Sequence, residues 1–445
     1  MGMAVKMNEG PARHGAIVER VGPRVKRPLA RRTPTPPAWG ILVGESPIFR
    51  YILKSPMAKA DKSSEASEGS NAEERMGGKL QLAGRMRGAL RALIPAALNI
   101  AGGHGDFDPV ERDGVCARCL RDWPDEPDFL ARWNELLARN PWATVFLGPA
   151  WQSAVVNEFV PAGQFRLITV SRQRQLLAVL PLGLNTSSML ETPGSWVTDY
   201  LDPLIDSEAA AECWEIILRL LDELWDWSMG GVLLHQVRAD SPLRQILPGL
   251  SPQFGFEYKE TLDVKAPYIM LPKSWDDYLA SLDGHERKEI KRKIRNAQTK
   301  ANLQWLTIQR EEELVPALDR ALAAMCQAES DKADFTDEVL VGFLRRLCPI
   351  LARQGDFFLD ELWLDGKPSA WLLRLRSNRG PMIYNTTYEF AQRQWSPGIV
   401  GFSLAIRDAI AAGAPVFNLL RGAEEYKARL GAKDLDLFRV TLTPS

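Results

Sequence analysis

The segment Trp395–Gly401 combines residue types that suit the binding of an anion. It reads Trp-Ser-Pro-Gly-Ile-Val-Gly and stands between a predicted strand and a predicted helix. The first N–H groups of a helix lack intrahelical partners and carry partial positive charge, so they attract phosphate. Pro397 sets the entry of the chain into the helix, and Gly398 lets the backbone approach a ligand closely. An ordinary helix cap fits the same residues, so the segment predicts either a phosphate site or a cap.

A run of cations forms the densest charge cluster outside the N-terminal region. Six of the nine residues from 287 to 295 are basic: Arg287, Lys288, Lys291, Arg292, Lys293 and Arg295. On a helix, residues four apart share one face. Such a face suits a phosphorylated or acidic acceptor, for example a nucleotide sugar or a glycan, and it also suits plain solvation. Aromatic residues do not alternate with these cations, so no nucleic acid is expected as a partner.

Residues that bind metals or form catalytic triads are sparse. Cys116 and Cys119 have the C-x2-C spacing, but no second pair follows, and a structural zinc needs four ligands. We therefore expect no metal site. His235 lies in an apolar run and is interpreted as a core histidine, and His285 is the only other histidine after residue 104. No Ser-His-Asp set and no Walker sequence can be assigned.

The elements that would position these residues recur in two series. The first series has helices at 129–139 and 149–159, strands at 165–171 and 176–184, an extended stretch at 196–205, a helix at 209–227 and a strand at 231–237. The second series has helices at 275–282, 286–298, 314–327 and 337–353, strands at 357–364, 369–376 and 382–388, a helix ending at 412 and a strand at 416–420. This order predicts two copies of one mixed α/β unit that meet near Asp263–Pro267.

The N-terminal region differs from the rest in charge and composition. Residues 1–100 hold 17 Lys and Arg against 8 Asp and Glu, whereas the whole chain of 445 residues has a net charge of −1. The acidic remainder argues against a nucleic-acid-binding core. Residues 1 to about 75 are predicted to be disordered. Residues 81–100 form a basic amphipathic pattern, which either contacts a membrane surface or a partner, or packs on its own domain.

Membrane spans and disulfides are not expected. No apolar run is long enough to cross a membrane, no signal peptide is recognisable, and five cysteines make no disulfide framework. These features predict a cytoplasmic protein.

Several short motifs, taken together in their order, resemble the GNAT acyltransferases of the CelD-like type, which are associated with cellulose biosynthesis and related to the FemABX transferases. The resemblance covers roughly residues 129–438, and it rests on Phe146–Trp151, Asp199–Pro203, Leu271–Tyr278, Glu286–Arg292, Leu364–Ala370, Ser396–Gly398 and Asn418–Lys427. Three positions depart from the family pattern: Trp395 stands where Gln or Arg is usual, and Asn418 and Ala423 each stand near a usual Asp.

The resemblance implies a tandem GNAT-like fold, with two copies of a mixed sheet flanked by helices and a disordered N-terminal tail. The expected parts are a tail at 1–120 with the helix 81–100, a first domain at 121–265 without a cofactor loop, and a second domain at 266–445 with a CoA-type loop. The implied activity transfers an acyl group from acetyl-CoA or another acyl-CoA, a cosubstrate that is not permanently bound, to an amine or hydroxyl. The acceptor would be a sugar, a polysaccharide precursor or a small metabolite.

The resemblance also assigns roles to residues. The pyrophosphate of CoA is expected at Ser396, Pro397, Gly398 and Gly401. Because a thioester is already activated, the enzyme must mainly align the acceptor, stabilise the oxyanion and supply a base. The catalytic candidates are Glu424, Tyr426 and Asp199, with Glu329 and His285 as further possible bases. The candidates for substrate binding are Arg287, Arg292, Tyr384, Arg421 and Lys427, and Tyr384 is also a possible acid.

Two other functions remain open from the sequence. One is a FemABX-like transferase that uses aminoacyl-tRNA. The other is a non-catalytic scaffold of a polysaccharide synthase, with synthase components as partners and the helix 81–100 as the docking element.

Overall fold

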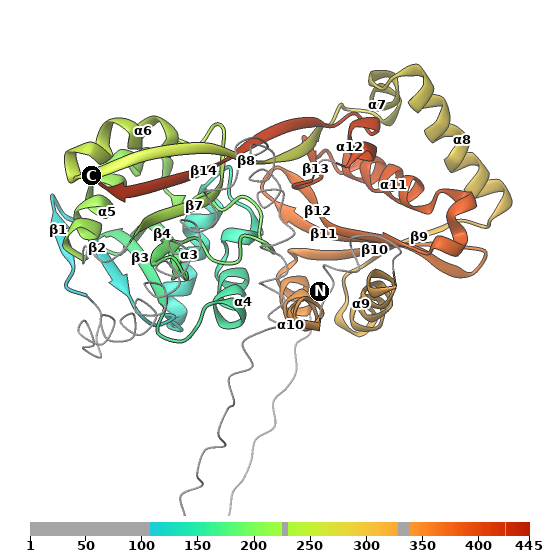
Figure 1. Cartoon of the computed structure of the whole chain (residues 1–445). Coiled ribbons are helices and arrows are strands. Elements are labelled where there is room, and N and C mark those ends of the chain that lie inside the picture. The colour runs from blue at the N-terminus through green and yellow to red at the C-terminus, as the bar shows by residue number, and fades with distance from the viewer. Residues whose placement is uncertain (1–106, 225–229, 328–337, 423) are drawn as a thin grey trace, which may run out of the picture. The chain divides into compact units, whose positions relative to one another are not determined.

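The computed structural model describes residues 107–224, 230–327, 338–422 and 424–445, which lie within one compact unit. The predicted mixed α/β fold is confirmed, because the described strands form one large mixed sheet with helices on its faces (Figure 1). The predicted disorder of residues 1 to about 75 and the predicted helix 81–100 lie outside the described residues.

The first half contains two helices before its main strands and one long helix after them. Its elements are β1 (Val110–Arg112), β2 (Val115–Leu120), α3 (Pro127–Arg139), α4 (Pro149–Phe159), β3 (Phe165–Arg172), β4 (Gln175–Leu184), β5 (Met189–Glu191), β6 (Leu204–Ile205), α5 (Ala210–Leu224), β7 (Gly231–Arg238), α6 (Leu243–Leu250) and β8 (Phe256–Met270). The predicted helix 149–159 has the bounds of α4.

The second half repeats this arrangement after two additional helices. Its elements are α7 (Trp275–Ser281), α8 (Gly284–Lys300), β9 (Gln304–Ile308), α9 (Glu311–Cys326), α10 (Glu338–Gln354), β10 (Phe357–Leu364), β11 (Lys367–Ser377), β12 (Gly380–Tyr388), α11 (Pro397–Ala411), β13 (Val416–Asn418), α12 (Glu425–Arg429) and β14 (Lys433–Pro444). The predicted hairpin turn between β10 and β11 is confirmed, since Asp365 and Gly366 both have positive φ, as the tight hairpin turn requires.

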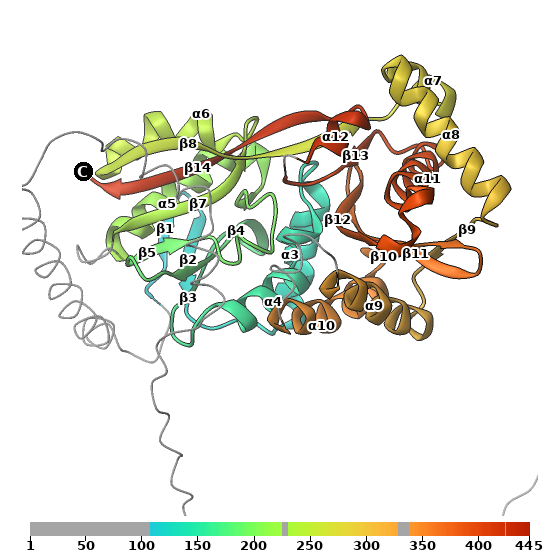
Figure 2. The same ribbon diagram turned by 45° about the vertical axis from the view of Figure 1, so that its right-hand side comes forward.

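The two halves exchange their last strands. Within the sheet, β7 of the first half pairs with β14, and β13 of the second half pairs with β8. The two long strands β8 and β14 also pair with each other over twelve positions and so join the halves (Figures 1 and 2). The predicted boundary near Asp263–Pro267 therefore lies inside β8 and not in a linker.

The expected tail ends earlier than predicted. Residues 110–120, which we assigned to the tail, form β1 and β2, and β2 pairs with β3. The side chains of Val115, Ala117 and Cys119 alternate along β2 and are buried in the core of the first half. The predicted limit of the tail at residue 120 is therefore wrong, because residues 107–120 belong to the folded first half. The alternation along β2 is short and directly follows a polar segment, so it gives only a weak signal in the sequence.

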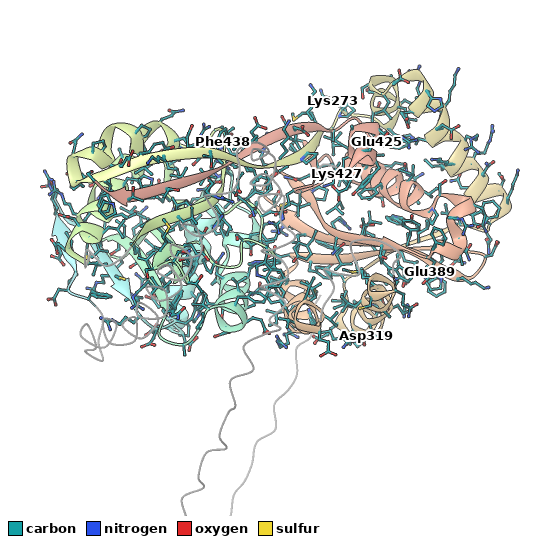
Figure 3. All side chains as sticks on the ribbon, viewed as in Figure 1. Lys273, Asp319, Glu389, Glu425, Lys427 and Phe438 are labelled. Carbon is teal, nitrogen blue, oxygen red and sulfur yellow. The ribbon has the colours of Figure 1, made fainter. Side chains whose placement is uncertain are left out.

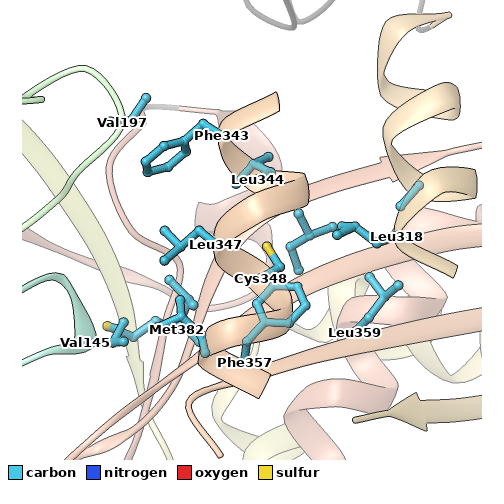
Figure 4. Packing of buried hydrophobic residues seen from close by; sticks show 14 of the residues in the cluster. Val145, Val197, Leu318, Phe343, Leu344, Leu347, Cys348, Phe357, Leu359 and Met382 are labelled. Carbon is cyan, nitrogen blue, oxygen red and sulfur yellow. The ribbon is translucent and has the colours of Figure 1, made fainter. Parts of the chain in front are cut away.

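One apolar core is shared by both halves. Helix α4 packs on α10, with the rings of Trp151 and Phe343 5.8 Å apart and edge-to-face. Val145 and Val197 of the first half join the cluster that also contains Phe343 and Leu347 of the second (Figure 4). In Figures 1 and 2, α9 and α10 cover one face of β10–β12 and α11 covers the other. The core thus fixes β12 and α11 against the first half.

Candidate active site

Strands β12 and β13 are parallel but pair at one position only. Met382 is opposite Asn418, and beyond this pair the chain after β13 turns to β8, where the amide of Leu419 donates to the carbonyl of Pro267 at 2.9 Å. At the start of β12, a Cβ on Gly380 would lie 2.2 Å from the carbonyl oxygen of Val416. Glycine thus permits the close approach of the two strands at the start of β12, and β13 ends at the paired residue Asn418.

Tyr384 is a bulged residue in the middle of β12. On β11, Leu373 is opposite Asn385 and Arg374 is opposite Ile383, so Tyr384 has no partner in the ladder. A bulge re-aims the side chain it carries. The hydroxyl of Tyr384 donates to the carbonyl of Val197 at 3.0 Å, and its ring lies 5.4 Å from that of Trp151. This candidate for substrate binding therefore contacts the first half through its phenol.

Asp199 and Arg421 form a buried ion pair between the halves. The Nε of Arg421 lies 3.0 Å from Oδ1 of Asp199, and the backbone N–H of Arg421 donates to Oδ2 at 3.3 Å. The same guanidinium also donates to the carbonyls of Ser195 and Trp196. The arginine therefore holds the segment 195–199 against the residues that follow β13.

Lys427 is a buried cation whose ammonium binds the backbone next to Arg421. It donates to the carbonyls of Arg421 at 2.8 Å, Leu420 at 3.3 Å and Gly422 at 3.4 Å, and it lies 3.0 Å from Oε2 of Glu424. Burial lowers the pKa of Lys427, while the carboxylates of Glu424 and Asp199 act in the opposite direction. Figure 3 shows Lys427 near the long strands β8 and β14.

Asn418 joins the same segment to a tyrosine of the first half. Its Oδ1 accepts from the N–H of Leu420 at 2.8 Å, and its Nδ2 donates to the hydroxyl oxygen of Tyr200 at 2.8 Å. Leu420 and Tyr200 both have positive φ, of 53° and 56°. An amide can accept and donate at once, whereas a carboxylate only accepts, so these two bonds explain why Asn suits this position.

Glu424 and Tyr426 lie at the start of α12. Glu424 is exposed, precedes the helix and pairs with Lys427. The ring of Tyr426 lies 5.1 Å from that of Phe402 on α11, and burial raises the pKa of its phenol. In the part of the chain that the structure describes, the Tyr426 hydroxyl has no recorded hydrogen-bond partner.

The N-terminus of α11 is free of a side-chain cap. Ser396 has a positive φ of 53° and makes no side-chain bond to the helix, and Pro397 has no N–H to donate. Gly398 lies beside the ring of Tyr388, at a distance that leaves room for a Cβ. Gly401 differs: a Cβ there would lie 3.0 Å from Leu372 of β11. It is on the face of α11 that packs on the sheet.

Arg287 and Arg292 are on α8, and no recorded contact joins them to the residues around Arg421 within the described chain. Arg292 binds Glu289 of its own helix at 2.7 Å and 3.0 Å. The link from α8 to α12 is instead Glu286, which pairs with Arg429 at 3.0 Å. The predicted cationic face exists, with Lys288, Lys291, Arg292 and Arg295 exposed.

The other candidates take structural positions or fall outside the described residues. His235 lies between two carboxylates, 3.5 Å from Glu191 and 3.8 Å from Asp263, and His285 is exposed at the start of α8. Glu329 is outside the described residues. Within those residues, no cluster of His, Cys, Asp and Glu could hold a metal ion, and no helix is long and apolar enough to cross a membrane.

Five of the predicted residues are thus brought together: Asp199, Tyr384, Arg421, Glu424 and Lys427. Tyr200 also links the halves, and nothing in its sequence neighbourhood predicts this role. Its partner Asn418 is 218 positions away, and no local pattern marks a contact over that separation.

Part of the second half of the chain is similar to a known protein family. Residues 284–428 match the family model described as an acetyltransferase (GNAT) domain. No curated protein matches the chain. Among solved structures, FemX is 11% identical with a TM-score of 0.49, over 70% of this chain and 95% of that one. A tandem GNAT protein from the clavulanic acid biosynthesis pathway is 12% identical with a TM-score of 0.40, over 74% and 99%. The C-terminal domain of a lysylphosphatidylglycerol synthetase from Agrobacterium fabrum, named putative, is 11% identical with a TM-score of 0.45, over 70% and 90%.

Proposed function

We propose, since residues 284–428 match a GNAT acetyltransferase domain, that this chain transfers an acyl group from acyl-CoA to an amine or hydroxyl. The observation that supports the proposal most is the order β12, α11 and β13 within the matched residues. The two parallel strands pair at one position only, and the helix between them begins with an uncapped N-terminus. This arrangement offers a phosphate site and an unpaired strand edge next to each other.

The CoA pyrophosphate would bind at the start of α11. The backbone N–H groups of Gly398 and Ile399 precede the first intrahelical bond, in which Val400 donates to Ser396, and they are available to an anion. Ser396 and Pro397 shape the turn, and Gly401 lets the helix lie close to β11. The thioester arm would run along the free edge of β12.

The chemistry would need a base for the acceptor and an acid for the thiolate. We assign the base to Glu424, because its carboxylate is exposed and reachable by an acceptor. Tyr426 would protonate the leaving thiolate, because burial keeps its phenol protonated and its hydroxyl is available.

Asp199, Tyr384, Arg421 and Lys427 would position these groups without reacting. The Asp199 carboxylate is buried and held by Arg421, so an acceptor does not reach it as it reaches the exposed Glu424. Lys427 fixes the backbone between β13 and α12, from which Glu424 and Tyr426 project.

The acceptor class rests on the motifs that resemble CelD-like proteins. We propose a sugar or a polysaccharide precursor, with the cations of α8, including Arg287 and Arg292, as a binding face for an acidic acceptor.

Thermal unfolding of the full chain with acetyl-CoA, free CoA and a long-chain acyl-CoA tests the donor. A ligand that binds only the folded state at 100 times its Kd adds about 2.7 kcal/mol, which raises the melting temperature. The Gly398→Glu variant should abolish the rise, because a Cβ fits there and the new carboxylate repels phosphate. Gly249→Glu, which enters open space on α6, is the matched control and should keep it.

Absence of a shift with all three compounds would refute the acyl-CoA donor. Acyl transfer from aminoacyl-tRNA, the other donor that the resemblance to FemABX transferases leaves open, would then be the next assay. Failure of both assays would favour the scaffold role.

A kinetic assay tests the base. Glu424→Gln should lower kcat by about 100-fold and leave the affinity for acyl-CoA unchanged. Glu425→Gln, at the next position and exposed, is the control that should retain activity.

A further inference from the structure

A polar pocket lies between the halves, at the start of β12 and β13. Its volume is about 220 Å³, and its polar lining comes from both halves and includes Thr144, Tyr200, Arg238, Asp240, Arg379 and Asn418 beside the ring of Trp142. We call it the interface pocket. At about 30 Å³ per water molecule, its volume holds roughly seven waters, which is the size of a small ligand.

Two guanidinium groups lie on one aromatic ring in this pocket. The Arg238 and Arg379 guanidinium carbons are 4.6 Å and 4.5 Å from the ring centroid of Trp142, which is 41% exposed. Each cation is attracted by the face of the ring over which it lies.

The two arginines differ in their other partners. Arg238 is buried, and its Nε lies 3.2 Å from Asp240 and 3.9 Å from Asp202, so its charge is largely balanced. For Arg379, by contrast, no ion pair of the guanidinium is recorded within the described residues, and its charged group contacts Trp142. The guanidinium of Arg379 is therefore the cation of the lining that no carboxylate pairs with in the described part of the chain.

Hydroxyl groups without full hydrogen bonding also line the pocket. Thr144 is 7% exposed, and its Oγ1 has no hydrogen-bond partner within the described residues, which is costly for a buried hydroxyl. Tyr200 accepts from Asn418, and no acceptor for its own proton is recorded there. Burial raises the pKa of Tyr200, so the hydroxyl stays a donor. Both groups can bind an oxygen of a ligand.

The remaining wall is apolar. Met270, Pro381, Met382, Val416 and Leu435 complete the lining, and Met270 is exposed over about half of its surface. An inorganic ion would leave this wall in contact with water. An organic molecule with one anionic end would cover it.

We propose that the interface pocket binds a small organic anion, with its phosphate or carboxylate group on Arg379 and its uncharged body against Met270 and Pro381. The pocket is at the opposite end of β12 from the N-terminus of α11 and shares no residue with the proposed CoA site at 396–401, so the inference does not depend on the donor.

Calorimetric titration of the full chain with glucose 1-phosphate, glucuronate and glucose tests the proposal. At least one of the two anions should bind with a saturable isotherm, and glucose should bind at least about tenfold more weakly, a difference of about 1.4 kcal/mol. Binding of the phosphate, the carboxylate or both identifies the anionic group. No saturable binding of either anion up to about 10 mM would overturn the proposal.

Variants locate the bound anion. Arg379→Ala should lower the affinity at least about tenfold, and Arg379→Lys should retain part of it. Thr144→Val should weaken binding without lowering the melting temperature, because the lost hydroxyl has no partner in the described part of the fold.

The control variant is Arg132→Ala, which removes an arginine that lies over Phe129 outside the pocket. Its affinity for the anions should equal that of the parent chain. An unchanged affinity in Arg379→Ala would also overturn the proposal. The melting shift with acetyl-CoA should persist in all these variants.

Discussion

The ion pair between Asp199 and Arg421 joins residues 222 positions apart and is among the most buried contacts of the candidate active site. Asp199→Asn keeps the size of the side chain but leaves the guanidinium without its charge partner. We expect a loss of about 3 kcal/mol in the free energy of unfolding, as for a broken buried pair. Urea unfolding followed by tryptophan fluorescence measures it.

The matched control is Asp319→Asn on the surface. Asp319 pairs with Arg345 at 2.8 Å, and both side chains are about half exposed (Figure 3). Such a pair contributes less than about 1 kcal/mol. Equal losses in the two variants would contradict the structural importance of the Asp199 pair.

His235 makes the stability of the first half depend on pH. Burial acts to lower its pKa, but the hydrogen bonds and charges of Asp263 and Glu191 outweigh burial, so the pKa of His235 is raised above 6.5. The protonated form thus stabilises the fold below pH 6.5, and this contribution is lost as the pH rises through the raised value. The pKa values of Glu191 and Asp263 are lowered, so their contribution is lost only in acid, as the pH falls through those lowered values.

The melting temperature should accordingly fall as the pH is raised above 6.5, and His235→Gln should remove that fall. His285→Gln, at an exposed position on α8, should keep it. If the melting temperature of His235→Gln fell with rising pH as much as that of the parent chain, the coupling between His235 and stability would be ruled out. Melting curves between pH 5 and pH 9, at about one-unit steps, are sufficient.

At the scale of elements, the contact between α11 and β11 depends on Gly401. A Cβ there would be 3.0 Å from Leu372 and 3.8 Å from Trp305, so a larger side chain must displace the helix. Gly401→Val should destabilise the protein by about 1–3 kcal/mol, as overpacking does. Gly398→Ala meets Tyr388 at 3.5 Å, an ordinary contact, and should leave the stability unchanged. Equal stability of the two variants, measured by urea unfolding, would contradict the packing role of Gly401.

Most elements with strong periodicity could be predicted from the sequence. The predicted bounds of α4 and β10 match the structure, and those of α3, β3, β4 and β7 differ by one or two residues at an end. Strand β8 could not be predicted, because most of its residues between Glu257 and Lys265 are exposed on both faces, so no alternation marks them. The order of elements predicted the repeat, but it does not say which strand pairs with which.

Those residues of the candidate site that belong to a recognisable sequence motif could be predicted. The segment from Asn418 to Lys427 and the pair Asp199-Tyr200 are recognisable as motifs, and the structure brings them together. The interface pocket was not predictable. Trp142, Arg238 and Arg379 come from three distant segments, and each is by itself an ordinary residue of a loop or strand end.

At the scale of the whole described fold, the last strand completes the sheet of the first half. Removal of 433–445 should expose the edge of β7, and hydrogen exchange at residues 231–238 should rise by at least about tenfold. A chain that lacks residues 1–113 loses β1, an edge strand of three residues, and should keep the protection of β7. Unchanged protection of β7 after removal of 433–445 would show that β14 is dispensable there.

The exchange of last strands also determines when the protein can finish folding during its synthesis. Strand β7 leaves the ribosome long before its neighbour β14, which is made roughly 200 residues later. Until then the first half has an open apolar sheet edge, and an open edge invites pairing with other chains. In the nascent first half this edge of β7 therefore stays without its native partner until β14 has been made, and a chain that stops before β14 would be prone to aggregation.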